Sequence, residues 1–147
     1  MSRFGFIHHP ESVTLVVVDG DELVLVRQSR PGAPGTRTLE LPAGSCEPGE
    51  TPAEAAAREL AEECGLAAAS LRPIGSFYVV PAYSSELTHV YEATGLSPAS
   101  AESDEDEDIT LERRPVGQTL RALSDAGSIA ALALWLGQAA GASQSST

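Results

Sequence analysis

Three glutamates, Glu59, Glu62 and Glu63, lie at positions i, i+3 and i+4, so that on a helix their carboxylates share one face. Like charges at this spacing mildly destabilise a helix unless a positive group lies between them. A hard divalent cation with oxygen ligands, Mg²⁺ or Mn²⁺, would relieve the repulsion. An acidic helical face is also typical of a helix that is merely exposed to solvent, and these three residues alone favour that plainer interpretation.

The segment that carries the glutamates has strong helix signals. Thr51 fits an N-cap, Pro52 fits the first helical position, and Glu54 completes a capping box. Alanines dominate the interior, and alanine has the highest helix propensity. Gly65 stands where a left-handed residue would end the helix. The sequence therefore predicts a helix that begins after Thr51 and ends before Gly65.

The wider segment resembles the signature of the Nudix hydrolases at every fixed position. It runs Gly44, five residues, Glu50, seven residues, Arg58-Glu59-Leu60, one residue, Glu62-Glu63, one residue, then Gly65 and an aliphatic residue. The resemblance implies an enzyme that cleaves a diphosphate bond with Mg²⁺ or Mn²⁺ as cofactor. It also implies an ion pair between Glu50 and Arg58, and metal ligation by Glu59 and Glu63, with Glu62 close by and a backbone carbonyl near Ala43 or Gly44.

The residues before and after this signature resemble the ADP-ribose pyrophosphatase branch of the family. The matching features are the strand-like run 23–30 with its Arg-Gln-x-Arg end, the run 40–44, and Pro81, which lies 15 residues after Leu66. The branch implies hydrolysis of ADP-ribose, or of a related nucleoside diphosphate compound, to AMP and ribose 5-phosphate. The residues that could then bind substrate are Arg27, Arg30, Arg37, Glu40 and Pro81. For each arginine alone, a surface salt bridge is an equal alternative.

The acidic run 104–108 is a second candidate for chemistry. By resemblance to the same branch, Glu105 would activate the attacking water and Glu107 would add a metal ligand. A glutamate of the helix, Glu59 or Glu62, is the alternative base. Acidic runs are usually solvated loops, and only the Nudix resemblance moves the functional interpretation ahead.

Composition limits the class of protein. The chain has 147 residues, 42% hydrophobic content, a formal net charge of -12 and two cysteines. Nucleic-acid polymers and anionic membranes are therefore poor partners, because nothing compensates their phosphate charge. With no apolar run near 18 residues and no apparent secretory signal, we expect a cytoplasmic protein with free thiols. We also expect one domain over residues 1–140 and a disordered tail over residues 141–147.

Hydrophobic patterning predicts strands and helices around the signature. The expected strands are residues 13–18 and 22–27, joined by an Asp-Gly turn, a short strand before Pro42, and residues 74–80, 87–93 and 109–112. Residues 118–125 and 128–140 are expected to be helical, and residues 96–108 to be a loop. The fold class predicted from these elements and from the resemblance is α+β, a Nudix-type α/β/α sandwich with a mixed sheet between helices.

The sequence leaves the type of activity, the substrate range and the oligomeric state open. A Nudix hydrolase of nucleoside triphosphates or dinucleoside polyphosphates is an alternative within the enzyme class, and a non-catalytic nucleotide-sensing domain is a weaker one. Members of the ADP-ribose branch carry an additional N-terminal sheet that is exchanged across a dimer and helps to bind adenine. About a dozen residues precede Val13, so we expect a different adenine pocket and a broader substrate range, with a homodimer left open.

Overall fold

The central sheet is built on an antiparallel hairpin of mostly apolar residues, which is formed by β1 (Ser12–Asp19) and β2 (Glu22–Ser29). The computed structural model describes residues 5–100 and 108–145. Its elements are β1 (Ser12–Asp19), β2 (Glu22–Ser29), β3 (Arg37–Glu40), β4 (Ala43–Ser45), α1 (Pro52–Cys64), β5 (Leu66–Tyr78), β6 (Leu87–Pro98), β7 (Thr110–Pro115), the 3-10 helices η1 (Val116–Gln118) and η2 (Leu120–Ala122), and α2 (Ala126–Ser145). The hairpin and α1 were both predicted.

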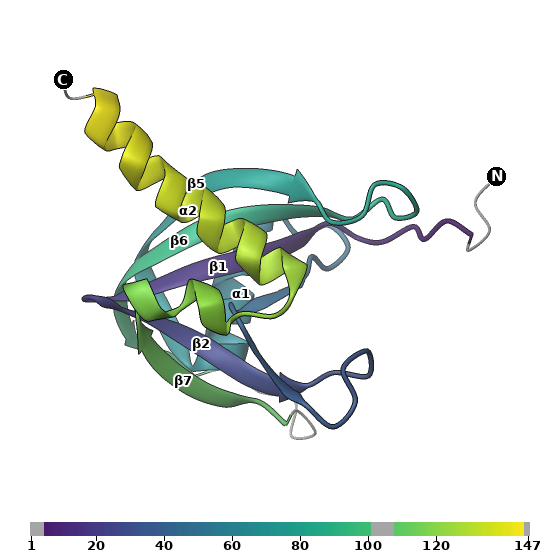
Figure 1. Ribbon diagram of the computed structural model, residues 1–147, viewed down its shortest axis with the longest axis horizontal. Helices are drawn as coiled ribbons and strands as arrows, with labels where there is room; N and C mark the ends of the chain where they lie inside the picture. The colour runs from purple at the N-terminus through teal and green to yellow at the C-terminus, as the bar shows by residue number, and fades with distance from the viewer. Residues whose placement is uncertain (1–4, 101–107, 146–147) are drawn as a thin grey trace.

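Pairing around β1 makes the sheet mixed. β1 runs parallel to β6 and antiparallel to β2 and β4, while β6 pairs antiparallel with β5. β2 contacts β1 only near the turn, and farther along it pairs with β3 on that side and with β7 along its other edge. Figure 1 shows β1 and β2 diverging with distance from their shared turn. β4 pairs with β1 and β3 pairs with β2 beyond this point, which brings the start of the signature segment to the middle of the sheet.

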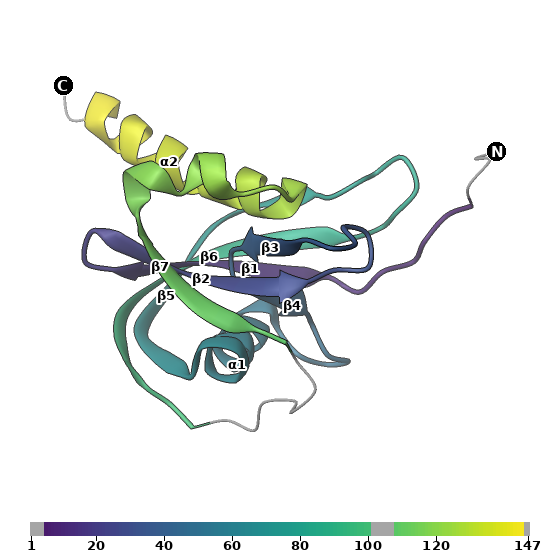
Figure 2. The same ribbon diagram turned by 60° about the horizontal axis from the view of Figure 1, so that its bottom comes forward.

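Helices cover both faces of this sheet. Figure 2 shows α1 on one side and α2 on the other. Residues of β1 alternate between two cores: Val13 and Val17 pack with Ala56 and Leu60 of α1, whereas Val16 packs with Leu132 of α2. This explains why the strand is apolar on both faces, as expected for a sheet buried on both sides. The α/β/α sandwich with a mixed sheet is confirmed.

The structure corrects several element boundaries. β5 begins at Leu66 directly after α1, and β6 continues to Pro98, into the region expected to be a loop. η1 and η2 replace the single helix expected over residues 118–125. α2 runs to Ser145, so the disordered tail expected from Gly141 is helical through that residue. No residue of β5 is fully buried, so hydrophobic alternation did not reveal its first half. The alanine-rich end of the chain favours continued helix. Within the described residues, no helix is both long and apolar enough to span a membrane.

Candidate active site

α1 presents its glutamates toward β4 because both of its ends are fixed. The Thr51 hydroxyl accepts a hydrogen bond from the Glu54 amide at 3.2 Å, and Gly65 ends the helix in the left-handed region at φ 65°. This is the capping predicted from the sequence. The helix packs against β1 and β5 through its apolar face, which leaves its acidic face beside the signature loop.

Gly44 allows the closest approach between β4 and α1. A Cβ atom added to Gly44 would lie 2.1 Å from the Glu59 carboxyl carbon, far inside van der Waals contact. The Glu59 carboxylate thus lies against the backbone of β4, and any larger residue at position 44 would displace it. One residue earlier, the Ala43 amide donates a hydrogen bond to Glu63 Oε2 at 3.3 Å. Two glutamates of α1 therefore contact the β4 backbone.

Arg58 lies among the carboxylates and connects loop to helix. Its Nε and Nη2 donate to the two oxygens of Glu50 at 2.8 and 2.9 Å, and Nη2 also donates to the Ser45 carbonyl at 2.9 Å. Its Nη1 donates to Glu59 at 2.8 Å and to Glu62 at 3.2 Å. The paired guanidinium lowers the pKa of Glu50 to about 2, and the same pairing raises the pKa of Arg58. The predicted Glu50–Arg58 ion pair is confirmed.

Glu59 differs electrostatically from the other carboxylates of this face. It is only 9% exposed, and burial raises its pKa despite the opposing effect of Arg58.

No group of three or more His, Cys, Asp or Glu side chains in the part of the chain that the structure describes is arranged as a metal cluster. The available donors, carboxylates of α1 and the nearby Ala43 carbonyl, are all oxygens, which is the donor set that suits Mg²⁺ or Mn²⁺.

Arg30 and Glu40 form a second polar centre near the end of β2. Arg30 donates through Nε and Nη2 to both oxygens of Glu40, each at 2.9 Å, and the Thr38 hydroxyl donates to Glu40 at 2.6 Å. Burial acts to raise the pKa of Glu40, but these hydrogen bonds outweigh it and leave that pKa below its usual range. Glu40 is 6% exposed, and both of its carboxylate oxygens accept hydrogen bonds from Arg30. Its carboxylate therefore holds Arg30 in place.

The other two candidate arginines are bound within the fold. Arg27 donates to Glu112 of β7 at 3.1 Å and to the Arg37 carbonyl at 3.1 Å. Arg37 pairs with Asp108 and donates to the Thr110 hydroxyl at 3.2 Å. Both arginines tie β2 and β3 to the β7 region, which matches the salt-bridge alternative from the sequence.

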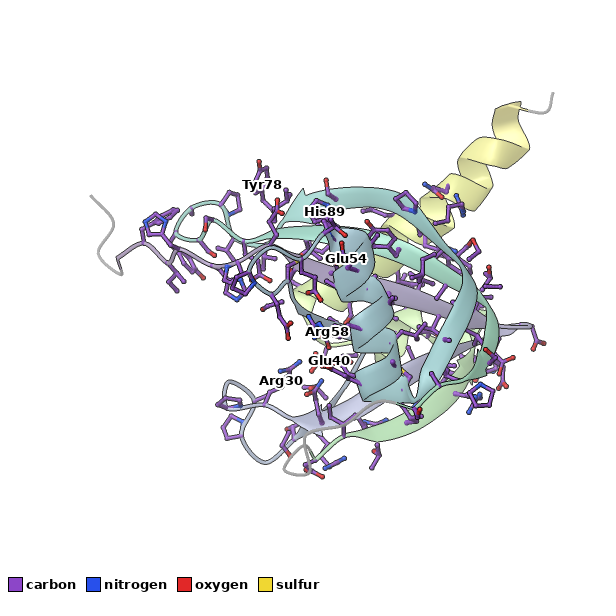
Figure 3. All side chains as sticks on the ribbon, turned by 180° about the vertical axis from the view of Figure 1, so that it is seen from behind. Arg30, Glu40, Glu54, Arg58, Tyr78 and His89 are labelled. Atoms are coloured by element: carbon purple, nitrogen blue, oxygen red, sulfur yellow. The ribbon has the colours of Figure 1, made fainter. Side chains whose placement is uncertain are left out.

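A cleft of about 420 Å³ is lined by the Arg30–Glu40 pair and by β4, the strand whose backbone contacts Glu59 and Glu63 of α1. Figure 3 shows Arg58 on α1 and, in the same view, the paired Arg30 and Glu40. The cleft is lined by β4, by Arg30 and Glu40, by polar residues of β1 and β6, by the N-terminal arm and by the start of α2: His9, Ser12, Thr14, Arg30, Glu40, Ala43, Gly44, Ser45, Val79, Glu86, Thr88, Asp125, Ala126, Gly127 and Ser128. Pro81 is not part of the lining, although Val79 and Glu86 on either side of it are.

Sequence reasoning missed several of these lining residues. Ser12 and Thr14 are buried polar residues inside an apolar strand, and this interruption was a usable signal. Asp125 and Ser128 gave no such signal, because they look like ordinary residues at a helix start. The predicted base Glu105 and metal ligand Glu107 lie in residues 101–107, outside the described residues.

Comparison with known proteins identifies the family. The model of the NUDIX domain matches residues 8–132, which is most of the chain. The chain belongs to the Nudix family. This Nudix chain is 39% identical to the ADP-ribose pyrophosphatase of Bacillus subtilis (strain 168) over 113 residues, covering 76% of the chain and 60% of that relative. It is 36% identical to the ADP compounds hydrolase NudE of Escherichia coli (strain K12) over 117 residues, covering 78% of the chain and 61% of that relative.

Solved structures agree with the fold. A crystal structure of an ADP compounds hydrolase superposes with a TM-score of 0.81 at 31% identity, over 89% of this chain and 73% of that one. The solution structure of the Escherichia coli ORF135 protein superposes with a TM-score of 0.73 at 19% identity, over 92% of this chain and 94% of that one, and supports the fold alone. The chain spans about three fifths of the length of the two curated relatives described above.

Proposed function

We propose that this Nudix protein hydrolyses the diphosphate bond of ADP-ribose, or of a related nucleoside diphosphate compound, with a divalent metal. The observation that carries the proposal is the junction of α1 and β4, where Arg58 clamps Glu50 and Glu59 is packed against Gly44. This complete signature stands beside a cleft that contains Arg30. The two curated relatives described above are named for ADP-ribose or ADP compounds, which favours the same substrate class here.

The carboxylates of Glu59, Glu62 and Glu63 and the Ala43 carbonyl would hold Mg²⁺ or Mn²⁺, with Glu107 as a further ligand. When bound, such an ion supplies positive charge to the diphosphate oxygens and makes a coordinated water easier to deprotonate. Arg30 is already held by Glu40, so little side-chain entropy remains to be lost when it binds a phosphate oxygen. The leaving products would be AMP and ribose 5-phosphate.

Glu105 is our choice for the base that takes the proton from the attacking water. Glu59 and Glu62 both accept hydrogen bonds from Arg58, so oxygens of both carboxylates already have a partner in the fold. Their contacts fit binding better than proton transfer, and this argues for a base outside α1. The acidic segment that contains Glu105 precedes β7, the strand that pairs with β2 along the edge away from β1.

The test is turnover of a substrate panel with products resolved by anion-exchange chromatography. The panel holds ADP-ribose, nucleotide sugars, dinucleoside polyphosphates and nucleoside triphosphates, each with Mg²⁺, Mn²⁺ or chelator. We expect AMP and ribose 5-phosphate from ADP-ribose, only when metal is present. Preferred cleavage of triphosphates or dinucleoside polyphosphates would support that alternative within the family, and nucleotide binding without any turnover would support a sensing domain.

Variants then assign the roles. Glu63→Gln should abolish turnover and leave nucleotide binding largely intact. Glu105→Gln should lower kcat by about 100-fold or more, the usual contribution of a general base. Glu102→Gln, two residues before the acidic run 104–108, is the matched control and should keep full activity. Equal activity of the Glu105 and Glu102 variants would move the base to Glu59 or Glu62.

For assembly and location we propose a homodimer in the cytoplasm. Phe6 and Ile7 of the N-terminal arm and Tyr83 of the β5–β6 loop are exposed, and a β-bridge between Ile7 and Ser84 holds the arm against this loop. We call these three exposed side chains the ridge. A subunit contact there would bury apolar area. Both cysteines are free thiols, as is usual in a reducing compartment. Light scattering after size exclusion would test the dimer, and Ile7→Ser should weaken it if the ridge forms the contact.

A further inference from the structure

Hydroxyl side chains of β1 and β6 form part of the floor of the cleft. Ser12, Thr14 and Thr88 line the cleft, and all three are buried. The other residues of β1 from Val13 to Val18 are apolar, so these hydroxyls interrupt an apolar sheet. A buried hydroxyl is costly unless it is hydrogen-bonded, and each of the three therefore needs a physical explanation.

Ser12 and Thr88 are explained by hydrogen bonds within the fold. The Ser12 hydroxyl donates to Glu86 Oε2 at 2.8 Å. Because a hydroxyl has one proton to donate, the 2.8 Å contact between Ser12 and Thr88 is a hydrogen bond that Thr88 donates. The two hydroxyls thus form a chain that ends on a carboxylate, and both of their protons are used by the protein itself.

Thr14 has no such partner. Its hydroxyl makes no hydrogen bond with another described residue, and among those residues only His89 and Asp125 have a side-chain polar atom that is both sealed from solvent and unpartnered. The Thr14 hydroxyl is therefore not sealed, although the residue as a whole is only 5% exposed. Because Thr14 lines the cleft, its hydroxyl is accessible from the cleft.

The register of the sheet places Thr14 beside the signature segment. Thr14 lies directly opposite Ala43 of β4. Opposite residues of an antiparallel pair have Cα atoms about 4.5–5.5 Å apart and side chains on one face. The Ala43 amide contacts Glu63 of α1, and Ala43, Thr14 and Arg30 line the same cleft. Thr14 is thus close to both groups that the proposed function assigns to the diphosphate, the acidic face of α1 and Arg30.

We infer that Thr14 is a substrate-binding residue whose hydroxyl donates a hydrogen bond to an oxygen of the substrate diphosphate. The inference rests on the proposed function. A ligand that fills the cleft removes water from this hydroxyl, and the loss is offset only when the ligand supplies an acceptor. Phosphoryl oxygens are negatively charged, and hydrogen bonds to charged groups are stronger than those between neutral groups.

Thr14→Val removes the hydroxyl and keeps the shape of the side chain. Valine is β-branched and suits a strand, and here it replaces a buried hydroxyl that has no protein partner. Thermal unfolding in metal-free buffer should therefore show an unchanged or higher Tm. Thr14→Ser is the conservative variant, because it keeps the hydroxyl.

Thr119→Val is the matched control. Thr119 is also buried, but its hydroxyl donates to the Pro115 carbonyl at 2.9 Å and the residue is not part of the cleft lining. This variant should lower the Tm, because the Pro115 carbonyl loses its donor, and it should leave kcat/KM unchanged. The two Thr→Val variants therefore have opposite expected effects on stability and on activity.

The expected result for Thr14→Val is a fall in kcat/KM for ADP-ribose of about 10- to 100-fold, the usual effect of losing a hydrogen bond to a charged group. Thr14→Ser should stay close to wild type. The fall should be equal for ADP-ribose and for a nucleotide sugar with another terminal sugar, because both contain the diphosphate. Calorimetric titration with the methylene analogue of ADP-ribose, in which a carbon replaces the bridging oxygen, should show a weaker Kd for Thr14→Val.

A folded Thr14→Val variant with unchanged kcat/KM and unchanged Kd would overturn the inference while leaving the proposed function standing. An equal fall in Thr14→Ser would also overturn it, because the hydroxyl would not be the cause, and so would a fall confined to one terminal sugar. If the wild-type protein turns over no member of the panel, the proposed function fails. The titration then decides: a weaker Kd of Thr14→Val supports the contact, and equal Kd values overturn it.

Discussion

Glu50 offers the sharpest test of how the signature loop is held. Glu50→Gln keeps the shape of the side chain and removes its charge. The pKa of Glu50 falls from 4.5 to about 2 through pairing with Arg58, which corresponds to about 3 kcal/mol at about 1.4 kcal/mol per unit. Because the side chain is still 13% exposed and Gln can accept one of the same hydrogen bonds, we expect a loss of about 2 kcal/mol in the free energy of unfolding.

The direction of the pKa shift of Glu50 determines how this loss of stability depends on pH. A carboxyl group with a depressed folded-state pKa stabilises the fold fully above its unfolded pKa of 4.5, and the contribution is lost as pH falls toward about 2. Wild-type protein and Glu50→Gln should therefore differ most above pH 5.5, and the difference should shrink steadily between pH 4.5 and pH 2.

The assay is thermal unfolding followed by circular dichroism in metal-free buffer. A loss of about 2 kcal/mol corresponds to about 4–8 °C in Tm for a chain of this size. Asp19→Asn is the matched control, because Asp19 pairs with Arg113 at an exposed site where the two side chains are 51% and 46% exposed, and such pairs contribute little. Asn also suits the turn at this position. Equal Tm changes in the two variants, or a Glu50→Gln effect that ignores pH, would refute the reasoning.

Three further predictions concern α1 and the residues that contact or end it. Gly44→Ala should lower kcat by about 100-fold or more in the assay of ADP-ribose hydrolysis, because the new Cβ would displace the Glu59 carboxylate and small misplacements at a catalytic centre are costly; unchanged kcat would contradict the close approach. Cys64 should stay unmodified by iodoacetamide at pH 8 in mass spectrometry until the protein is denatured, because burial raises the pKa of its thiol to about 12 and only the thiolate reacts. Gly65→Ala should lower the stability by about 1 kcal/mol in urea unfolding, because the residue ends α1 at φ 65°, and a change below about 0.3 kcal/mol would count against this strain.

The sequence predicted best what depends on local signals. α1 was placed correctly from Thr51 to Gly65, because its caps and alanine content lie within the helix itself. The ion pair between Glu50 and Arg58 followed from the Nudix signature. β5 was shortened in the prediction because its stability comes from pairing with β6, which no short stretch of sequence can show.

The cleft was predicted less well, because distant segments build it. Arg27 looked like a phosphate ligand at the end of a strand, but pairing of β2 with β7 brings Glu112 beside it and commits its guanidinium there. Asp125 and Arg30 line the same cleft although they are far apart in the chain. Only the packing of α2 on the sheet brings them together, so Asp125 could not be found from residue spacing.

The position of Arg58 has a consequence for the metal-free protein. One nitrogen of its guanidinium contacts both Glu59 and Glu62, so the acidic helix carries its own counter-ion. Folding then has no need of a divalent cation to balance these charges, unlike small domains that unfold when their metal is removed. An incoming ion would compete with Arg58 for the same oxygens, and its affinity would reflect an exchange of one cation for another. Metal supply would then control when the protein is active, while the protein stays folded throughout.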